Sequence, residues 1–344
     1  MRVLYSSMKH PVTYVQGPPG TGKTQTILNV VLSAFLNRKT VLVCSSNNRP
    51  VDGIIEKLTF NYGTTTVDFP YLRLGNYSET AKATIRIKEL FDKIEKEFRK
   101  PDEEKLDYIR NQNNQRNGKL VELLHRYEQN RNLKEALDTL EHLVAATQGK
   151  LSGAMSVLVE KRRQELLAQL MDLKPVTNND VLALFTPALD NPHFMQYMFY
   201  ESLRFLSGLK MPRMRELIGI VHIEDDKTRV KEFNSWLADD AHLKSLLHIF
   251  PLIFSTNISS NRLGSGRAAF DMAIMDEAGQ CNVAQALIPL ARANSLLLVG
   301  DPNQLRPVIL LDDSTDEKLR KNTLSIIPMH TRAIPFWISC RGTT

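Results

Sequence analysis

The octapeptide GPPGTGKT at residues 17–24 decides the fold, because it joins the short apolar stretch TYVQ (residues 13–16) to the long apolar stretch QTILNVVLSAFL (residues 25–36). It matches the pattern G-x-x-x-x-G-K-[S/T], which indicates a phosphate-binding loop where it follows a strand and begins a helix. The glycines let backbone N–H groups point inward as an anion nest, and the helix N-terminus adds partial positive charge. The stretch therefore predicts a strand over residues 12–15, a phosphate-binding loop, and a helix over residues 24–36.

The side chains of this loop have distinct expected roles. Lys23 can reach the β- and γ-phosphates of a nucleotide, and the Thr24 hydroxyl can bind Mg²⁺. ATP and Mg²⁺ are therefore the expected ligands. The residues predicted to line the nucleotide site are Gly17, Pro18, Pro19, Gly20, Thr21, Gly22, Lys23, Thr24 and Gln25.

Two adjacent acids supply the expected metal partner of the loop. The stretch AIMDEAGQ (residues 273–280) is an apolar strand that ends in Asp276 and Glu277. Asp276 is placed to hold Mg²⁺ through water or together with Thr24. Glu277 can accept a proton from the water that attacks the γ-phosphate. Asp271 precedes the apolar run, so we assign it to the surface. We expect the regions around Lys23 and Asp276 to meet across neighbouring strands of one sheet.

A third strand end carries an amide. In VGDPNQLRP (residues 299–307) an apolar strand ends in Gly-Asp, and a proline turn then presents Gln304. An amide can hydrogen-bond both a γ-phosphate oxygen and a water, so Gln304 is predicted to report whether the phosphate is present. The catalytic candidates are Lys23, Glu277 and Gln304, the metal ligands are Thr24 and Asp276, and both Asp276 and Gln304 are also expected to bind the nucleotide.

The alternation of apolar strands with helices predicts the fold class. Strands are expected over residues 40–46, 71–75, 252–256, 272–278 and 295–301, and helices over residues 50–58 and 282–293. Continuous apolar strands separated by helices indicate a parallel sheet covered on both faces. We predict an α/β P-loop NTPase sheet with its first half in residues 1–75 and its second half in residues 246–311, followed by an irregular tail over residues 312–344.

The block between the two halves, residues 76–245, is predicted to be a helical insertion. Leucines recur at spacings near three and four between Leu133 and Leu173, as in a coiled coil. The polar stretch NQNNQRNG (residues 111–118) is expected to interrupt the helices. Residues 76–244 hold 27 Lys+Arg and 27 Asp+Glu, so the rest of the chain carries the whole formal net charge of +6. A solvated coiled coil and a guide or clamp for a partner both stay open as roles of the insertion.

The composition is that of a globular protein without a membrane anchor. The chain has 344 residues, of which 42% are hydrophobic and 24% charged, and its three cysteines form no CxxC pair. The first residues lack the apolar run of a signal peptide, and the most apolar stretch, residues 26–36, is too short to span a bilayer. We expect a soluble, cytoplasmic protein with no membrane partner, whose basic excess suits a polyanion such as nucleic acid.

The motifs occur in a recognisable order. GPPGTGKT is followed by VLVCSSNNRPVD, LRLG, IFSTNISS, DEAGQ and GDPNQLRPV. This series resembles motifs I, Ia, Ic, II and III of superfamily 1 nucleic-acid helicases, and above all the branch that includes the nonsense-mediated-decay helicase. The resemblance covers the first and third blocks, and DEAGQ followed by GDPNQLRP is more diagnostic than GPPGTGKT alone.

The resemblance implies a RecA-like motor domain that uses ATP to translocate on single-stranded DNA or RNA. It assigns to Lys23, Thr24, Asp276, Glu277 and Gln304 the roles given above. The loop SSNNRPVD (residues 45–52) resembles a segment that grips the nucleic-acid backbone, and the end of the strand over residues 252–256 resembles a second one. Such contacts position a strand without reading its sequence, and they make binding salt-dependent. The predicted nucleic-acid contacts are Asn48, Arg49, Ser255, Thr256 and Asn257.

Family members have a second RecA-like domain after the third motif, which carries arginine fingers. The 37 residues that follow Pro307 show neither a βαβ pattern nor the expected arginine motifs. We therefore expect the first motor domain alone, a truncated form that needs a second motor domain or another protein in trans. An arginine finger is worth ~10³–10⁵ in the rate of phosphoryl transfer, so we expect this chain alone to hydrolyse ATP very slowly.

Two other interpretations use the same residues. An ABC-type ATPase with a coiled-coil insertion also has an early P-loop and a late Asp-Glu pair. Its signature loop would have to be LSGAM (residues 151–155), which lies in the helical stripe far along the chain from Asp276. The second alternative is a non-catalytic nucleotide- or nucleic-acid-binding module, in which a Glu277→Gln change would leave the biological activity untouched.

Overall fold

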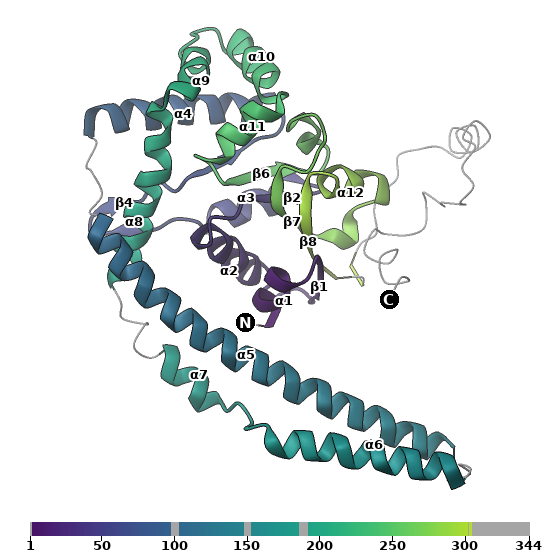
Figure 1. The fold of residues 1–344 in the computed structure, drawn as a ribbon. Helices are drawn as coiled ribbons and strands as arrows, with labels where there is room; N and C mark the ends of the chain where they lie inside the picture. The colour runs from purple at the N-terminus through teal and green to yellow at the C-terminus, as the bar shows by residue number, and fades with distance from the viewer. Residues whose placement is uncertain (1, 98–102, 148–152, 186–191, 302, 305–344) are drawn as a thin grey trace, which may run out of the picture. The chain divides into compact units, whose positions relative to one another are not determined.

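The computed structural model describes residues 2–97, 103–147, 153–185, 192–301, 303 and 304. The chain divides into two compact units (Figure 1). Unit 1 contains Met1–Tyr5 and Glu103–Phe194, and unit 2 contains Ser6–Asp102 and Met195–Thr344. The tail predicted over residues 312–344, and with it the expected lack of a second motor domain, lies outside the described residues.

Unit 2 is built on a parallel sheet, which within the described residues has six strands. Their order across the sheet is β1-β8-β7-β2-β6-β5, and every pair of neighbours is parallel. β2, with the sequence VLVCS, is buried along its whole length, as expected of a strand covered on both faces. The strands are β1 (Val12–Gln16), β2 (Val41–Ser45), β5 (Tyr71–Arg73), β6 (Leu252–Thr256), β7 (Phe270–Asp276) and β8 (Ala293–Gly300).

Strands from the two halves of the sequence alternate in this sheet. β1, β2 and β5 precede the helical insertion, and β6, β7 and β8 follow it. In the described sheet none of the three early strands pairs with another early strand, because β8, β7 and β6 lie between them. The two α/β blocks are therefore one structural layer, and neither half contains a complete sheet.

Helices cover the sheet in unit 2. α2 (Lys23–Leu36) and α3 (Asn48–Ile55) pack on β2, and α12 (Val283–Leu290) packs on β8. The main core contains Leu42, Leu72 and Ile253 from the sheet. It is completed by α4 (Tyr77–Glu97), α9 (Arg215–Val221), α10 (Asp226–Leu237) and α11 (Asp240–Leu247). The remaining elements are a small hairpin of β3 (Asn61–Tyr62) and β4 (Thr65–Thr66), the helix α8 (Pro192–Ser207), and the 3₁₀ turns η2 (Gly208–Lys210), η3 (Pro212–Met214), η4 (Ser259–Arg262) and η5 (Ala278–Gln280).

Unit 1 is a pair of long helices with a short third helix. α5 (Glu103–Ala146) and α6 (Gly153–Asp172) run side by side in opposite directions (Figure 1), and α7 (Asn178–Phe185) follows. The Arg163 Nε atom lies 3.9 Å from Glu141 Oε1 across the pair. The N-terminal helix α1 (Arg2–Lys9) begins in unit 1 and ends in unit 2.

The prediction that residues 111–118 interrupt the helices is wrong, because α5 runs through them without a break. Buried Leu106 and Ile109 on one side of the stretch and Leu123 on the other anchor the helix to its neighbours. Gly costs about 1 kcal/mol relative to Ala in a helix interior and Asn costs less, so packing on both sides outweighs the local preference.

The predicted fold class is confirmed: an α/β RecA-like P-loop sheet carries a large helical insertion between β5 and β6. The domain boundaries at residues 75, 245 and 311 stay predictions. Of the helices that the structure describes, none combines the length and the apolarity needed to cross a membrane.

Candidate functional site

The predicted site residues gather at the edge of the sheet where its parallel strands end. Gln16 of β1 is in register with Gly300 of β8, and Ser45 of β2 is in register with both Asp276 of β7 and Thr256 of β6. The loops that follow these strands therefore meet at one edge, which is where open α/β sheets bind ligands. The prediction of neighbouring strands needs one correction, because β8 lies between β1 and β7.

The phosphate-binding loop has the backbone of an anion nest. Gly20 and Gly22 have φ angles of 81° and 83°, a conformation that favours glycine, and Gly22 is the N-cap of α2. The Thr21 hydroxyl donates to the Pro18 carbonyl at 2.7 Å and closes the loop. A Cβ atom on Gly17 would lie 2.5 Å from Thr21 Oγ1, so the tight turn also excludes a side chain there.

Lys23 meets the predicted catalytic base. Its Nζ atom lies 3.7 Å from Glu277 Oε1, and both side chains are mostly buried. Gln280 Nε2 donates to the other carboxylate oxygen of Glu277 at 3.4 Å. Glu277 has φ 52° and ψ 41°, the left-handed conformation that a residue other than glycine adopts only at a cost of about 1–2 kcal/mol. The fold thus holds this carboxylate in place against a backbone preference.

Asp276 is a buried acid of this site. The residue is 6% exposed at the end of β7, and its Oδ1 atom accepts a hydrogen bond of 2.9 Å from the Glu277 backbone N–H. Burial raises the pKa of Asp276 to about 6, with a smaller upward contribution from the Glu277 charge, while that N–H and the Lys23 charge act in the opposite direction. A buried carboxylate with this cost of ionisation gains from a nearby cation.

The loops that follow β7 and β8 touch backbone to backbone, a feature that sequence reasoning missed. A Cβ atom on Gly279 would lie 2.7 Å from the Asp301 carbonyl oxygen, and one on Gly300 would lie 3.1 Å from the backbone nitrogens of Ala278 and Gly279. The glycines in DEAGQ and VGDPNQ are the signal that could have found this contact. Gln304 belongs to the second loop, where its backbone N–H donates to the Asp301 carbonyl at 3.2 Å.

The first predicted nucleic-acid segment is fixed to the sheet by an arginine. Arg73 of β5 donates from Nη2 to Asn48 Oδ1 at 2.7 Å and from Nε to Asp52 Oδ1 at 2.8 Å, so it ties α3 to the end of β5. Asn48 and Arg49 are both exposed at the start of α3. Arg73, which is 8% exposed, is a positioning residue that the sequence did not single out.

The second predicted segment lies deeper. Ser255 and Asn257 are fully buried, whereas Thr256 is half-buried and its Oγ1 atom donates to Ser259 Oγ at 2.8 Å. Asn257 donates from its backbone N–H to the Ser45 carbonyl at 2.9 Å and from Nδ2 to Cys281 Sγ at 3.0 Å. The structure thus brings Asn257 to the end of β2 and to Cys281, and leaves Thr256 as the least buried of the three.

Comparison with known proteins agrees with these motifs. The sequence profile of the AAA domain family matches residues 2–178 and 220–311. Helicase SEN1 of Saccharomyces cerevisiae is 25% identical over 329 residues, which are 93% of this chain and 13% of that protein. DNA polymerase alpha-associated DNA helicase A of Schizosaccharomyces pombe is 34% identical over 74 residues, 22% of this chain and 10% of that protein.

A third relative comes from the branch that the motifs suggested. The Regulator of nonsense transcripts 1 homolog of Drosophila melanogaster is 43% identical over 53 residues, 15% of this chain and 4% of that protein. The chain therefore spans only a small part of the length of these three relatives. The family match and the order of the motifs agree: the chain belongs to the AAA domain family, and within it to the superfamily 1 helicases of the branch that includes the nonsense-mediated-decay helicase.

Proposed function

We propose that this chain is the ATP-binding and ATP-hydrolysing motor domain of a nucleic-acid helicase. The observation that carries the proposal is the meeting of Lys23 Nζ with Glu277 Oε1 at 3.7 Å, beside buried Asp276 and at the start of α2. A cation, two acids and a helix N-terminus at one sheet edge are the groups that phosphoryl transfer from a nucleotide uses.

The phosphates of ATP would bind in the loop of residues 17–24. Its two glycines with positive φ angles let backbone N–H groups face the ligand, and α2 adds its partial positive charge. Lys23 then neutralises charge on the β- and γ-phosphates. Because Lys23 lies next to Glu277, phosphate binding would place the γ-phosphate close to the proposed base.

The residues present fit a magnesium ion bound together with the nucleotide. Among the described residues no group of three or more His, Cys, Asp or Glu side chains could hold a metal by itself. Magnesium in nucleotide sites needs only one or two protein ligands, because phosphates and water complete its shell. Thr24 and Asp276 would hold it, and the raised pKa of Asp276 marks a carboxylate that a cation stabilises. When bound, magnesium neutralises charge that develops on the phosphates.

Glu277 and Gln304 are the proposed partners of the attacking water. The Glu277 carboxylate, held by Lys23 and Gln280, accepts the proton of that water. Gln304 follows β8, whose loop contacts the loop of Glu277, and its amide would bond the γ-phosphate. We further propose that an arginine from a second motor domain or a partner protein completes the site in trans, so that residues 1–344 alone turn over slowly.

Single-stranded nucleic acid is the proposed partner of the same sheet edge. Asn48, Arg49 and Thr256 reach the surface and offer amide, guanidinium and hydroxyl groups to phosphates. Buried Ser255 and Asn257 would position these contacts rather than make them. The names of the relatives include a DNA helicase and a regulator of nonsense transcripts, which supports a nucleic-acid partner and leaves both DNA and RNA in the proposal.

Single-turnover hydrolysis of ATP in the presence of Mg²⁺ tests the proposal. Removing a general base costs about 10²–10⁴ in rate. Glu277→Gln is therefore expected to bind ATP like the wild type and to hydrolyse it at least ~100-fold more slowly. Glu56→Gln, which changes an exposed glutamate just after α3, is the matched control and should hydrolyse at the wild-type rate.

Two results would count against the proposal. Equal hydrolysis by the wild type and by Glu277→Gln would favour the non-catalytic binding module. Fast turnover of residues 1–344 alone with single-stranded DNA or RNA would remove the need for an arginine in trans.

A further inference from the structure

A cavity of unit 2 lies at the edge of the sheet where the strands begin, opposite the candidate nucleotide site. It encloses about 410 Å³, a size within the range of small-molecule sites. Thr40, Pro251 and Ala269 line it, and they directly precede β2, β6 and β7. The candidate nucleotide site lies where β2 and β7 end. Since β2 alone has five residues, at ~3.3 Å each, about 16 Å of strand separates the two sites.

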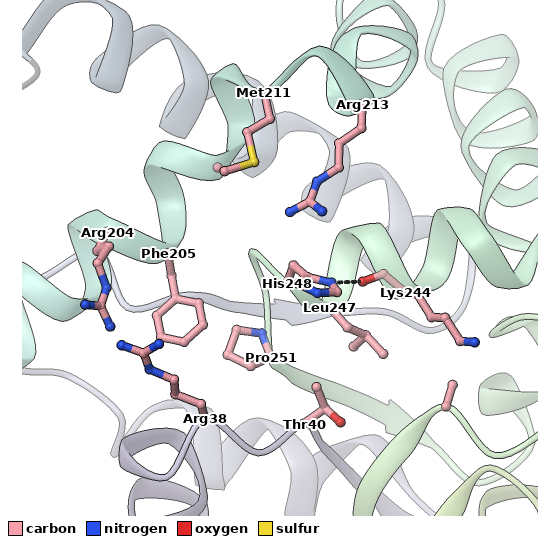
Figure 2. A pocket seen from close by; sticks show the side chains of 12 residues that line it. Arg38, Thr40, Arg204, Phe205, Met211, Arg213, Lys244, Leu247, His248 and Pro251 are labelled. Carbon is pink, nitrogen blue, oxygen red and sulfur yellow. Dashed lines mark hydrogen bonds between the residues drawn. The ribbon is translucent and has the colours of Figure 1, made fainter.

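The lining of this cavity is strongly basic. Arg38, Arg204, Arg213 and Lys244 contribute four permanent positive charges, and the described lining contains no Asp or Glu. Figure 2 shows that these cations come from four separate places: the end of α2, α8, the turn η3 and α11. Cations converging from elements far apart in the sequence create a local positive potential that favours an anion.

Part of this charge is already neutralised. Arg204 bonds Glu201, and the Arg38 Nε atom lies 3.8 Å from the same carboxylate, which is almost fully buried. By contrast, neither Arg213 nor Lys244 forms an ion pair with another residue that the structure describes, and both are exposed. One buried acid therefore faces two of the four cations. Arg213 and Lys244 have no ion-pair partner among the described residues, although Asp240, whose pKa is lowered chiefly by its hydrogen bonds with Ser265, also feels the Lys244 charge.

The backbone conformation of Arg38 is a separate observation in favour of a role for its side chain. Arg38 follows α2 with φ 55°, and the Lys39 N–H bonds the Ala34 carbonyl at 2.9 Å, the hydrogen bond of a Schellman helix end. Glycine is the usual residue in this position because it avoids the cost of the left-handed conformation. Here the chain has an arginine whose guanidinium lines the cavity (Figure 2).

Apolar groups complete the lining beside the cations. Phe205, Met211, Leu247 and Pro251 line the same cavity as the cations (Figure 2). A bare inorganic ion would use only the cations. An anion that carries a planar organic group would also cover the apolar surface, which adds the free energy of apolar burial to the ionic contacts.

We propose that this cavity is a second anion site, which binds the phosphate group of a nucleotide through Arg213, Lys244 and Arg38 with its organic part on Phe205 and Leu247. Two guanidinium groups and one ammonium group favour phosphate, because a planar fork of donors matches two phosphate oxygens and the lysine adds a third positive charge. A free nucleotide and a nucleotide within a nucleic-acid strand share this chemistry. The proposal does not rest on the motor function, because it involves neither Lys23 nor Glu277.

The test uses the full chain with Lys23→Ala, so that the phosphate-binding loop does not contribute to binding. Calorimetric titrations with inorganic phosphate, AMP and an eight-nucleotide oligo(dT) are compared between this protein and the same protein with Arg213→Ala and Lys244→Ala. Loss of two ionic contacts should weaken AMP binding by about ten-fold or more. For the oligonucleotide, the logarithm of the association constant should also depend less steeply on the logarithm of the salt concentration. The magnitude of that slope should fall by about 1.4, because two cations no longer neutralise phosphates.

A charge-matched pair of changes provides the control. Arg215→Ala with Lys231→Ala removes two exposed cations of unit 2 that do not line the cavity, and should leave AMP binding unchanged. Arg38→Gly is a third variant, which removes a lining cation while relieving its positive φ, so it should weaken AMP binding with an equal or higher Tm. AMP binding tighter than oligo(dT) identifies a free nucleotide as ligand, and the reverse order identifies a strand.

Three results would overturn the proposal. The first is equal binding of all three probes to the Arg213/Lys244 variant and to the Arg215/Lys231 control. The second is AMP binding no tighter than inorganic phosphate, a probe of similar charge without an organic part, since it would exclude a role for the apolar surface. The third is an acidic peptide without phosphate that binds as tightly as AMP and depends on the same residues.

Discussion

At the scale of single residues, Glu277 combines a proposed chemical role with an unfavourable backbone conformation. Its φ of 52° is paired with ψ of 41°, while its carboxylate lies next to Lys23. Strained backbone that persists beside charged groups is commonly found at functional sites. The effects of the strain and of the charge can be separated by experiment. Glycine and alanine both remove the carboxylate, but only glycine adopts the left-handed conformation without strain.

We predict that Glu277→Gly is more stable than Glu277→Ala by about 1 kcal/mol, the cost of placing a Cβ atom in the left-handed region. Urea denaturation of the two variants, without nucleotide or Mg²⁺, measures this difference. Both variants should lose ATP hydrolysis to the same extent. A Glu277→Ala variant as stable as Glu277→Gly would mean that the backbone at this position is not constrained.

At this scale the sequence predicted one contact that the structure contains. The motif GPPGTGKT with DEAGQ was enough to predict that Lys23 and Glu277 meet, although about 250 residues separate them in sequence. Arg73 was missed because one arginine in a short strand carries no pattern, and its role depends on contacts with Asn48 and Asp52. Burial of Ser255 and Asn257 was missed for a similar reason, since polar residues at a strand end give no sign of their depth.

At the scale of elements, the loops after β7 and β8 pack closely against each other. Gly279 leaves room for the Asp301 carbonyl, and Gly300 leaves room for the backbone of Ala278 and Gly279. Movement of the Gln304 loop toward the loop that carries Glu277 would therefore meet the backbone of that loop. A contact of this kind can communicate the presence of a γ-phosphate from one loop to the other.

We predict that Gly279→Ala destabilises unit 2 by about 1–3 kcal/mol, as overpacking against backbone does, and slows ATP hydrolysis. The matched control is Gly219→Ala in α9, where a Cβ atom would meet nothing within 4 Å. That change should stabilise the helix by roughly 0.5–1 kcal/mol. Thermal unfolding followed by circular dichroism compares the two, and a Gly279→Ala variant as stable as Gly219→Ala would argue against the close contact.

Element types were largely predictable, and their extents were less so. The predicted strand over residues 252–256 coincides with β6, while the strand predicted over residues 272–278 begins two residues earlier and ends at Asp276. The continuity of α5 could not be read from residues 111–118, because it depends on buried Leu106, Ile109 and Leu123 outside that stretch. Tertiary packing decides such cases, and a local pattern does not contain it.

At the scale of the whole molecule, the alternation of early and late strands makes the two halves of the sequence interdependent. β1, β2 and β5 find their described sheet partners only among β6, β7 and β8. The break between α5 and α6 separates the halves without cutting any described helix or strand. Two fragments divided there should therefore each be incomplete and should complement one another.

We predict that a fragment of residues 1–150 does not bind nucleotide although it contains the whole GPPGTGKT loop, and that mixing it with residues 151–344 restores binding. Fluorescence of a labelled ADP measures this, with helix content by circular dichroism as a check. As a control, a chain folded intact and then cleaved by protease at residue 150 should stay assembled and bind. Nucleotide binding by the first fragment alone would contradict the prediction.

The same strand order has a consequence for how a ribosome produces this protein. Gly17 of the nucleotide loop bonds the carbonyl of Gly300, about 280 residues later. At about 5–20 residues per second, roughly 15–60 s of translation separate the two. During that interval the apolar β1, β2 and β5 have emerged without their partners, and unpaired apolar strands are prone to aggregate. We therefore expect the N-terminal segment of the nascent chain to need protection from aggregation until β8 leaves the exit tunnel.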